Sequence, residues 1–144
     1  MSNTQYAFID KARVPDRAAL QASIEALGFD LKLHPEFSPF SDSGFLPFVL
    51  NGEEGPGFEI FYQSTDDVVG GDKLFRALAG GRDHCISMSW RGDMKDLAVV
   101  MIVSCALTKD FGAIVTYEGD DPEPLEDMLE ATHEIIRDAQ EGDE

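Results

Sequence analysis

The stretch HCISMSWRGD, residues 84–93, places a histidine, a cysteine, two serines, an arginine and an aspartate within ten positions. A cysteine activated by a neighbouring histidine is a common way to make a nucleophile. The alternation of residue types predicts a strand over 83–91, and successive side chains of a strand point to opposite faces. His84 and Cys85 therefore point apart, so we expect a structural role for Cys85 and no Cys–His pair.

Other sequence patterns for catalysis or metal binding are equally weak. His34, His84 and His133 fall on three different predicted elements without the spacing of a zinc site. The glycine pairs at 70–71 and 80–81 match neither a phosphate-binding loop nor a dinucleotide fingerprint, and no nucleophile elbow is present. We therefore predict no catalytic residue, no metal and no cofactor. Arg91-Gly92-Asp93 spells an integrin-binding tripeptide, but we interpret it as a turn and helix cap.

The carboxylates near the C-terminus are the most distinctive feature of the sequence. Residues 118–144 contain twelve acids and one base, Arg137. Five of these acids recur at steps of three and four residues on a predicted helix, so they form one polar row opposite its apolar positions. Like charges at this spacing disfavour the helix that carries them. This predicted acidic row consists of Glu123, Glu126, Glu130, Glu134 and Asp138.

The overall charge limits the classes of partner. The 144 residues include 28 acids and 11 bases, for a net charge of −17. Such a charge repels nucleic acids and anionic membranes and favours encounter with a basic protein. Two cysteines without a CxxC motif, no signal-peptide pattern and no apolar run of about 20 residues lead us to expect a cytoplasmic chain.

We therefore expect a non-enzymatic module that binds a basic protein through an acidic surface. In size and composition the chain resembles small acidic immunity proteins that neutralise bacterial toxins, and the resemblance implies a basic toxin as partner. The oligomeric state stays open. The predicted partner-binding residues are Glu118, Asp120, Asp121, Glu126, Glu130 and Glu134, with Asp66 and Asp67 as additions and the loop aromatics Phe37 and Phe40 as anchors.

Two other functions remain open at this stage. A nucleic-acid mimic would spread its carboxylates over a long surface, whereas this sequence concentrates them in one segment. A small ligand-binding or enzymatic domain would need a pocket, which a phenylalanine-rich hairpin could line. The hairpin residues in question are Phe45, Phe48, Phe58, Phe61 and Tyr62.

Periodicity and turn signals predict the elements that must position these residues. The chain reads as one α+β domain over residues 1–144, with about 140–144 as a frayed tail. We expect a largely antiparallel sheet of about five to six strands, with helices packed mainly on one face. A long NGEEGPG loop is expected to connect the strands of the hairpin. Predicted strands are 5–10, 29–33, 45–50, 58–63, 83–91 and 113–117, and predicted helices are about 14–28, 72–79, 93–110 and 122–140.

Overall fold

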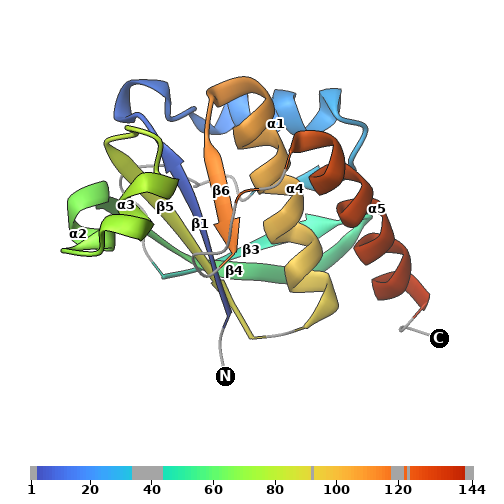
Figure 1. Ribbon diagram of the computed structural model, residues 1–144. Helices are drawn as coiled ribbons and strands as arrows, with labels where there is room; N and C mark the ends of the chain where they lie inside the picture. Colours follow the sequence, from blue (N-terminus) through green and yellow to red (C-terminus); the bar gives the residue numbers. More distant parts are fainter. Residues whose placement is uncertain (1–2, 34–43, 92, 118–121, 123, 142–144) are drawn as a thin grey trace.

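The computed structural model describes residues 3–33, 44–91, 93–117, 122 and 124–141 (Figure 1). Six strands are present in this part of the chain: β1 (Asn3–Ile9), β2 (Leu31–Lys32), β3 (Gly44–Leu50), β4 (Glu53–Ser64), β5 (His84–Trp90) and β6 (Ile114–Tyr117). A short 3-10 turn, Lys11–Arg13, follows β1. The α-helices are α1 (Arg17–Ala26), α2 (Thr65–Val69), α3 (Lys73–Leu78), α4 (Met94–Phe111) and α5 (Leu125–Glu141).

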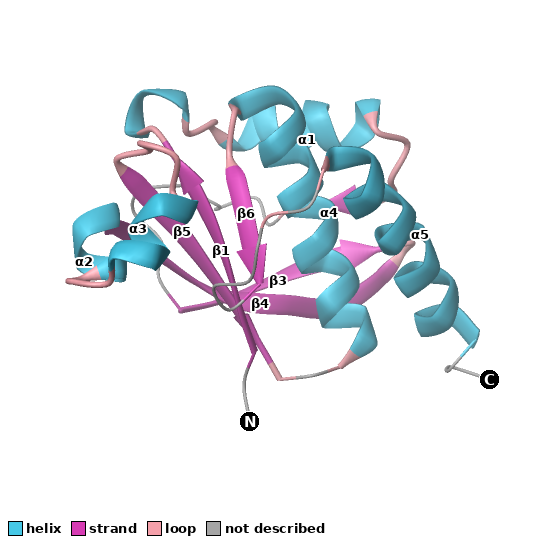
Figure 2. Ribbon diagram, viewed as in Figure 1, coloured by secondary structure: helices cyan, strands magenta, loops and turns pink. Residues whose placement is uncertain are grey.

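All six strands join one antiparallel sheet in the order β2-β3-β4-β5-β1-β6 (Figure 2). The predicted α+β class with a largely antiparallel sheet is therefore confirmed. None of the helices in the described residues combines the length and the apolar composition needed to cross a bilayer.

The predicted long loop between β3 and β4 is wrong. The strands are joined by a tight turn at Asn51 and Gly52, with φ of 50° and 82°, and β4 begins at Glu53. Two adjacent residues with positive φ are the signature of a type I′ hairpin turn, for which Asn-Gly is the preferred sequence. The segment EEGPG is thus part of the strand.

Helix α4 forms the centre of the core. Asp93 accepts a hydrogen bond from the Lys95 N–H at its start, and Gly112, with φ of 71°, ends it in the left-handed conformation. Two guanidinium groups bond to backbone carbonyls at this end: Arg13 donates to Asp110 and Arg82 donates to Gly112. Most of the residues between Ala98 and Leu107 are buried, as expected for a helix that is apolar on nearly every side.

The helices divide unequally between the two faces of the sheet. The long helices α1, α4 and α5 belong to the layer on one face, where Ile86, Met88 and Trp90 of β5 meet the core. The short helices α2 and α3 cover part of the other face, where a smaller cluster includes Phe8 and Cys85. In Figure 1, β6 faces the reader, with α4 and α5 to its right and α2 and α3 to its left. The prediction that helices pack mainly on one face is confirmed.

Candidate functional site

The reactive residues of β5 lie on opposite faces of the sheet, as the alternation predicted. Cys85 packs beside Phe8 and Val69 in the smaller cluster, whereas His84 belongs to the face that carries Ile86. Burial raises the pKa of the Cys85 thiol to about 12, so the thiol stays protonated at neutral pH. Cys105 is also a free, buried thiol, and desolvation raises its pKa as well.

The structure brings Ser64 close to His84, a neighbour that the sequence analysis did not identify. Ser64 lies directly opposite His84 in the β4–β5 pairing, and the His84 Nδ1 is 3.2 Å from a carboxylate oxygen of Asp83. The Ser64 hydroxyl instead accepts the Asp67 N–H as the cap of α2, and among the described residues it makes no hydrogen bond to His84. A Ser–His–Asp catalytic arrangement needs that bond. Ser64 therefore serves as a helix cap, Asp83 accepts the Lys11 backbone N–H, and His84 begins β5.

The described residues contain no group of three or more His, Cys, Asp or Glu side chains arranged to hold a metal ion. His133 lies on α5 with its ring 5.1 Å from the ring of Phe29. His84 starts β5, and His34 lies outside the described residues.

The hairpin aromatics do not line a common pocket. Phe48 and Phe58 are buried and stack with ring centroids 5.1 Å apart, while Phe61 points to the opposite face and is 40% exposed. The side chain of Phe45 lies outside the described part.

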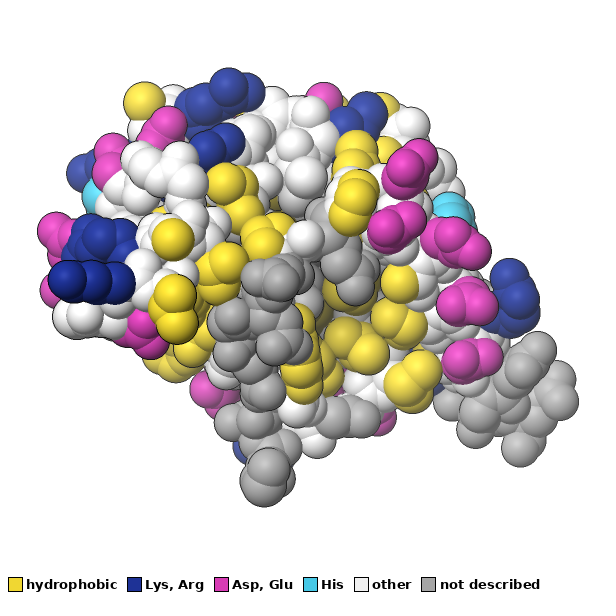
Figure 3. Space-filling model, in the orientation of Figure 1, with side chains coloured by type: hydrophobic (Ala, Val, Ile, Leu, Met, Phe, Trp, Pro, Cys, Tyr) yellow, Lys and Arg dark blue, Asp and Glu magenta, His cyan; other side chains and the backbone are white. Residues whose placement is uncertain are grey.

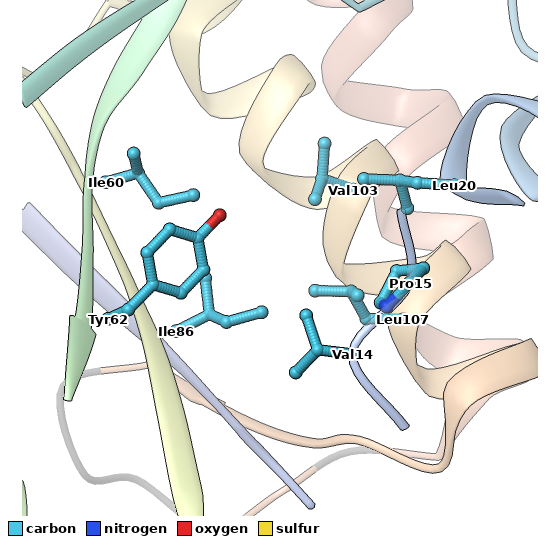
Figure 4. Close-up of a pocket in the computed structure, with 8 residues that line it drawn as sticks. All are labelled: Val14, Pro15, Leu20, Ile60, Tyr62, Ile86, Val103 and Leu107. Atoms are coloured by element: carbon cyan, nitrogen blue, oxygen red, sulfur yellow. The ribbon is translucent and has the colours of Figure 1, made fainter. Parts of the chain in front are cut away.

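Tyr62 does border a cavity between the sheet, α4 and the segment before α1 (Figure 4). The cavity is lined by apolar side chains, including Ile60, Ile86, Val103 and Leu107. Its volume of about 10 Å³ is enough for one water molecule at most. This cavity therefore does not support the ligand-binding hypothesis.

Helix α5 carries an acidic face directly opposite its packed face. Met128 and Thr132 are buried against α4, where the Thr132 hydroxyl lies 3.5 Å from the Cys105 sulfur. The exposed acids fall within an arc of about 120° on the other side, given 100° of rotation per residue. We call these residues the α5 acidic ridge: Glu126, Asp127, Glu130, Glu134 and Asp138. They form the column of acidic side chains on the right of Figure 3.

Among the described residues, the carboxylates of this ridge have no cationic partner. In the described part of the chain, none of the five forms an ion pair with a lysine or arginine. Asp127 was missed in the predicted acidic row, although its spacing of three and seven residues from Glu130 and Glu134 places it on the same face.

Several acids elsewhere in the described residues form ion pairs or accept backbone hydrogen bonds. Glu25 pairs with Lys32, Asp66 with Arg76 and Glu53 with Lys95. Three aspartates accept backbone N–H groups at the starts of helices, namely Asp16, Asp72 and Asp93. Asp83 accepts the Lys11 backbone N–H, and this bond lowers the pKa of Asp83 below its ordinary value. Asp30, Glu54 and Glu59 also form no ion pair among the described residues, but they lie outside α5, whereas the ridge gathers five such acids on one helix face.

The remaining predicted partner-binding residues do not extend the ridge. Asp66 and Asp67 lie on α2, on the side of the sheet away from α5 (Figure 1), so they are not continuous with it. The other predicted residues lie outside the described residues: Glu118, Asp120, Asp121, Phe37 and Phe40.

A second acidic feature is an open depression of about 230 Å³ between the β3–β4 hairpin and the start of α4. Lys95 lies within it and pairs with Glu53 at 2.7 Å. Asp96 accepts the Gly57 N–H, and desolvation raises the pKa of Asp96. The charges here are largely satisfied within the protein, so the α5 acidic ridge is the better candidate for binding.

Comparison with known proteins gives no family assignment: no family model and no curated protein matches the chain.

Proposed function

We propose that this chain is a non-enzymatic protein-binding module that engages a basic partner through the α5 acidic ridge. The observation that carries the proposal is the absence, among the described residues, of any cation paired with its five acids. The apolar face of α5 is already used by packing on α4, so the ridge contributes charge and little else to the fold. Carboxylates held in a fixed row and left uncompensated attract a complementary surface.

The partner class follows from the charge and the size of the chain. As a small acidic protein, the chain resembles immunity proteins, and we propose a toxin with a basic cleft as the partner. The free thiols of Cys85 and Cys105 are consistent with a reducing cytoplasm as the place of action. The ridge from Glu126 to Asp138 spans about 18 Å, at 1.5 Å per residue. This compact length supports a protein partner over an extended duplex mimic.

The test compares two triple variants that change the net charge equally, from −17 to −11. The ridge variant is Glu126→Lys, Glu130→Lys and Glu134→Lys. The control variant is Asp30→Lys, Glu54→Lys and Glu59→Lys. These three acids are exposed, lie outside α5 and form no ion pair with a described residue. Tagged forms of both, and of the natural sequence, capture proteins from the native cell at low and high salt.

We expect the natural sequence and the control to retain a basic protein that high salt releases, and the ridge variant to lose it. With the captured partner purified, the association rate at low salt should fall about tenfold or more for the ridge variant, because electrostatic steering contributes 10- to 1,000-fold. Equal association rates for the two triple variants would contradict the proposal.

A further inference from the structure

Two arginines from distant parts of the sequence meet at the end of α4. Arg13 closes the 3-10 turn after β1, and Arg82 lies just before β5. The Arg13 Nη2 donates to the carbonyl of Asp110 at 3.2 Å, and the Arg82 Nε donates to the carbonyl of Gly112 at 3.1 Å. Figure 3 shows Lys and Arg side chains at the top of the molecule, where α4 ends in Figure 1, apart from the acidic column on α5.

Both guanidinium groups contact Gly112. The position that a Cβ of Gly112 would occupy is 3.5 Å from the Cζ and 3.5 Å from the Nη1 of Arg13, so the Arg13 guanidinium lies against the glycine backbone. Arg82 bonds to the carbonyl of the same residue. One residue therefore separates the two guanidinium groups, which places them within about 10 Å of each other. Two like charges at this distance repel each other.

No neighbouring carboxylate in the described part of the chain balances these charges. The aspartates nearest to the two arginines along the chain or at their carbonyl partners are Asp10, Asp83 and Asp110. The first two accept backbone N–H groups, and the third accepts the Ser23 hydroxyl and lies 3.7 Å from the Lys109 ammonium. None of the three forms an ion pair with Arg13 or Arg82. Some cations elsewhere, such as Arg76, do pair with an acid.

Each guanidinium keeps most of its N–H donors for a ligand. A guanidinium carries five such donors in a planar fork. Arg13 uses one of them for Asp110, and Arg82 uses two, for Gly112 and for the carbonyl of Gly80 at 2.9 Å. These bonds hold the forks in place, and the remaining donors have no partner among the residues that the structure describes. Arg13 is exposed and Arg82 is half-buried, so a small ion in solution reaches both.

We propose that Arg13 and Arg82 form a binding site for a phosphoryl group. Guanidinium forks match the geometry of phosphate oxygens. Two arginines supply two positive charges, which balance the charge of about −1.5 to −2 on a phosphate monoester at pH 7, whereas a carboxylate would balance only one of them. At physiological salt the screening length is about 8 Å, so acids farther away oppose the ligand little. The site does not depend on the proposed function.

The first test uses the natural sequence, labelled with ¹⁵N, and inorganic phosphate as the probe at pH 7. The observed NMR signals are those of the arginine Nε–H groups. We expect the signals of Arg13 and Arg82 to shift and then saturate as phosphate is added. Arg137 provides the internal control, since it is exposed on α5 and forms no ion pair with a described residue, so its signal should stay in place. Sodium chloride at the same ionic strength should produce no saturable shift.

The second test compares two variants that change the net charge equally. Arg13→Gln should raise the Kd for inorganic phosphate about tenfold or more, because hydrogen bonds to a charged group are among the strongest in proteins. Arg137→Gln should leave this Kd unchanged. Arg13 is the better position for substitution, since it makes one backbone hydrogen bond, whereas Arg82 connects Gly80 to Gly112. Equal Kd values for the two variants would overturn the proposal.

A second probe, phosphoserine, identifies the source of the phosphoryl group. Binding at least tenfold tighter than that of inorganic phosphate would assign the site to a phosphorylated side chain, and similar or weaker binding would assign it to free phosphate; both results support the site. If phosphate moves neither arginine signal, or if sodium chloride moves them equally, the proposal is overturned and the two arginines serve only as caps of α4. Neither result would affect the proposed role of the α5 acidic ridge.

Discussion

Glu130 lies among other members of the α5 acidic ridge, so replacing it should stabilise the protein. Glu126 precedes it by four residues, Asp127 precedes it by three and Glu134 follows it by four. Each like-charged pair at these spacings costs about 0.2–0.5 kcal/mol. Glu130→Gln removes three such repulsions, which amounts to about 0.6–1.5 kcal/mol. Glu130→Lys also creates three attractions of similar size, for a total of about 1.2–3 kcal/mol.

The substitution isolates electrostatics because Glu, Gln and Lys have nearly equal helix propensities. For a domain of this size, the gain for Glu130→Lys corresponds to a rise in Tm of about 2–12 °C. We would measure urea and thermal unfolding at about 10 mM and 1 M salt. At 1 M salt the screening length is about 3 Å, so the gain should largely disappear.

Glu59→Lys is the matched control, since it changes the net charge by the same amount at an exposed position on β4, away from α5. It should shift Tm much less than Glu130→Lys at low salt. Equal Tm shifts for the two variants would refute the view that the carboxylates of the ridge repel one another. A gain in stability for Glu130→Lys that persists at 1 M salt would refute it as well. The same Glu130→Lys variant should bind the partner more weakly, because its stabilising change removes the proposed binding charge.

Two further predictions follow from the pKa shifts. The pKa of Asp83 is lowered in the folded chain, so the ionised carboxylate stabilises the fold. This stabilisation is complete above the ordinary pKa of 3.8 and is lost as the pH falls through the lower pKa of the folded state. Urea unfolding should therefore show Asp83→Asn to be less stable than the natural sequence at pH 7, with the difference shrinking below about pH 4; a constant difference down to pH 2 would contradict this. Cys85 and Cys105 should not react with an aromatic disulfide reagent at pH 8 until the protein is unfolded, because burial raises both thiol pKa values; rapid labelling of the folded protein would contradict their assignment as structural residues.

Features that depend on local periodicity could be predicted from the sequence. The separation of His84 from Cys85 needs only the two-residue repeat of a strand, and the acidic face of α5 needs only the helical repeat. The central position of α4 follows from a run that is apolar on almost every side. The hairpin turn could have been found too, because Asn51-Gly52 is the preferred sequence for that turn and was overlooked within the longer NGEEGPG segment.

Features that depend on which segments meet in space could not be predicted. The position of Asp66 and Asp67 away from α5 is set by the strand order, which places α2 and α3 on the opposite face. The opposition of Ser64 and His84 depends on the β4–β5 register. The sides of α4 that meet the sheet and α5 were hidden for the same reason: an all-apolar helix does not indicate which side packs where, and the contacts of Ser104 with Gln5 and of Cys105 with Thr132 fix this.

Solubility alone does not explain the α5 acidic ridge. Residues 1–117 carry sixteen acids and ten bases, a net charge of −6, which already lies within the magnitude of about 2–8 that keeps a small domain soluble. The remaining −11 is concentrated in residues 118–144, and within α5 the like charges oppose the helix that presents them. Spreading the same charge over the surface would give equal solubility without this repulsion. The clustered arrangement therefore supports the proposal of a basic partner that neutralises it.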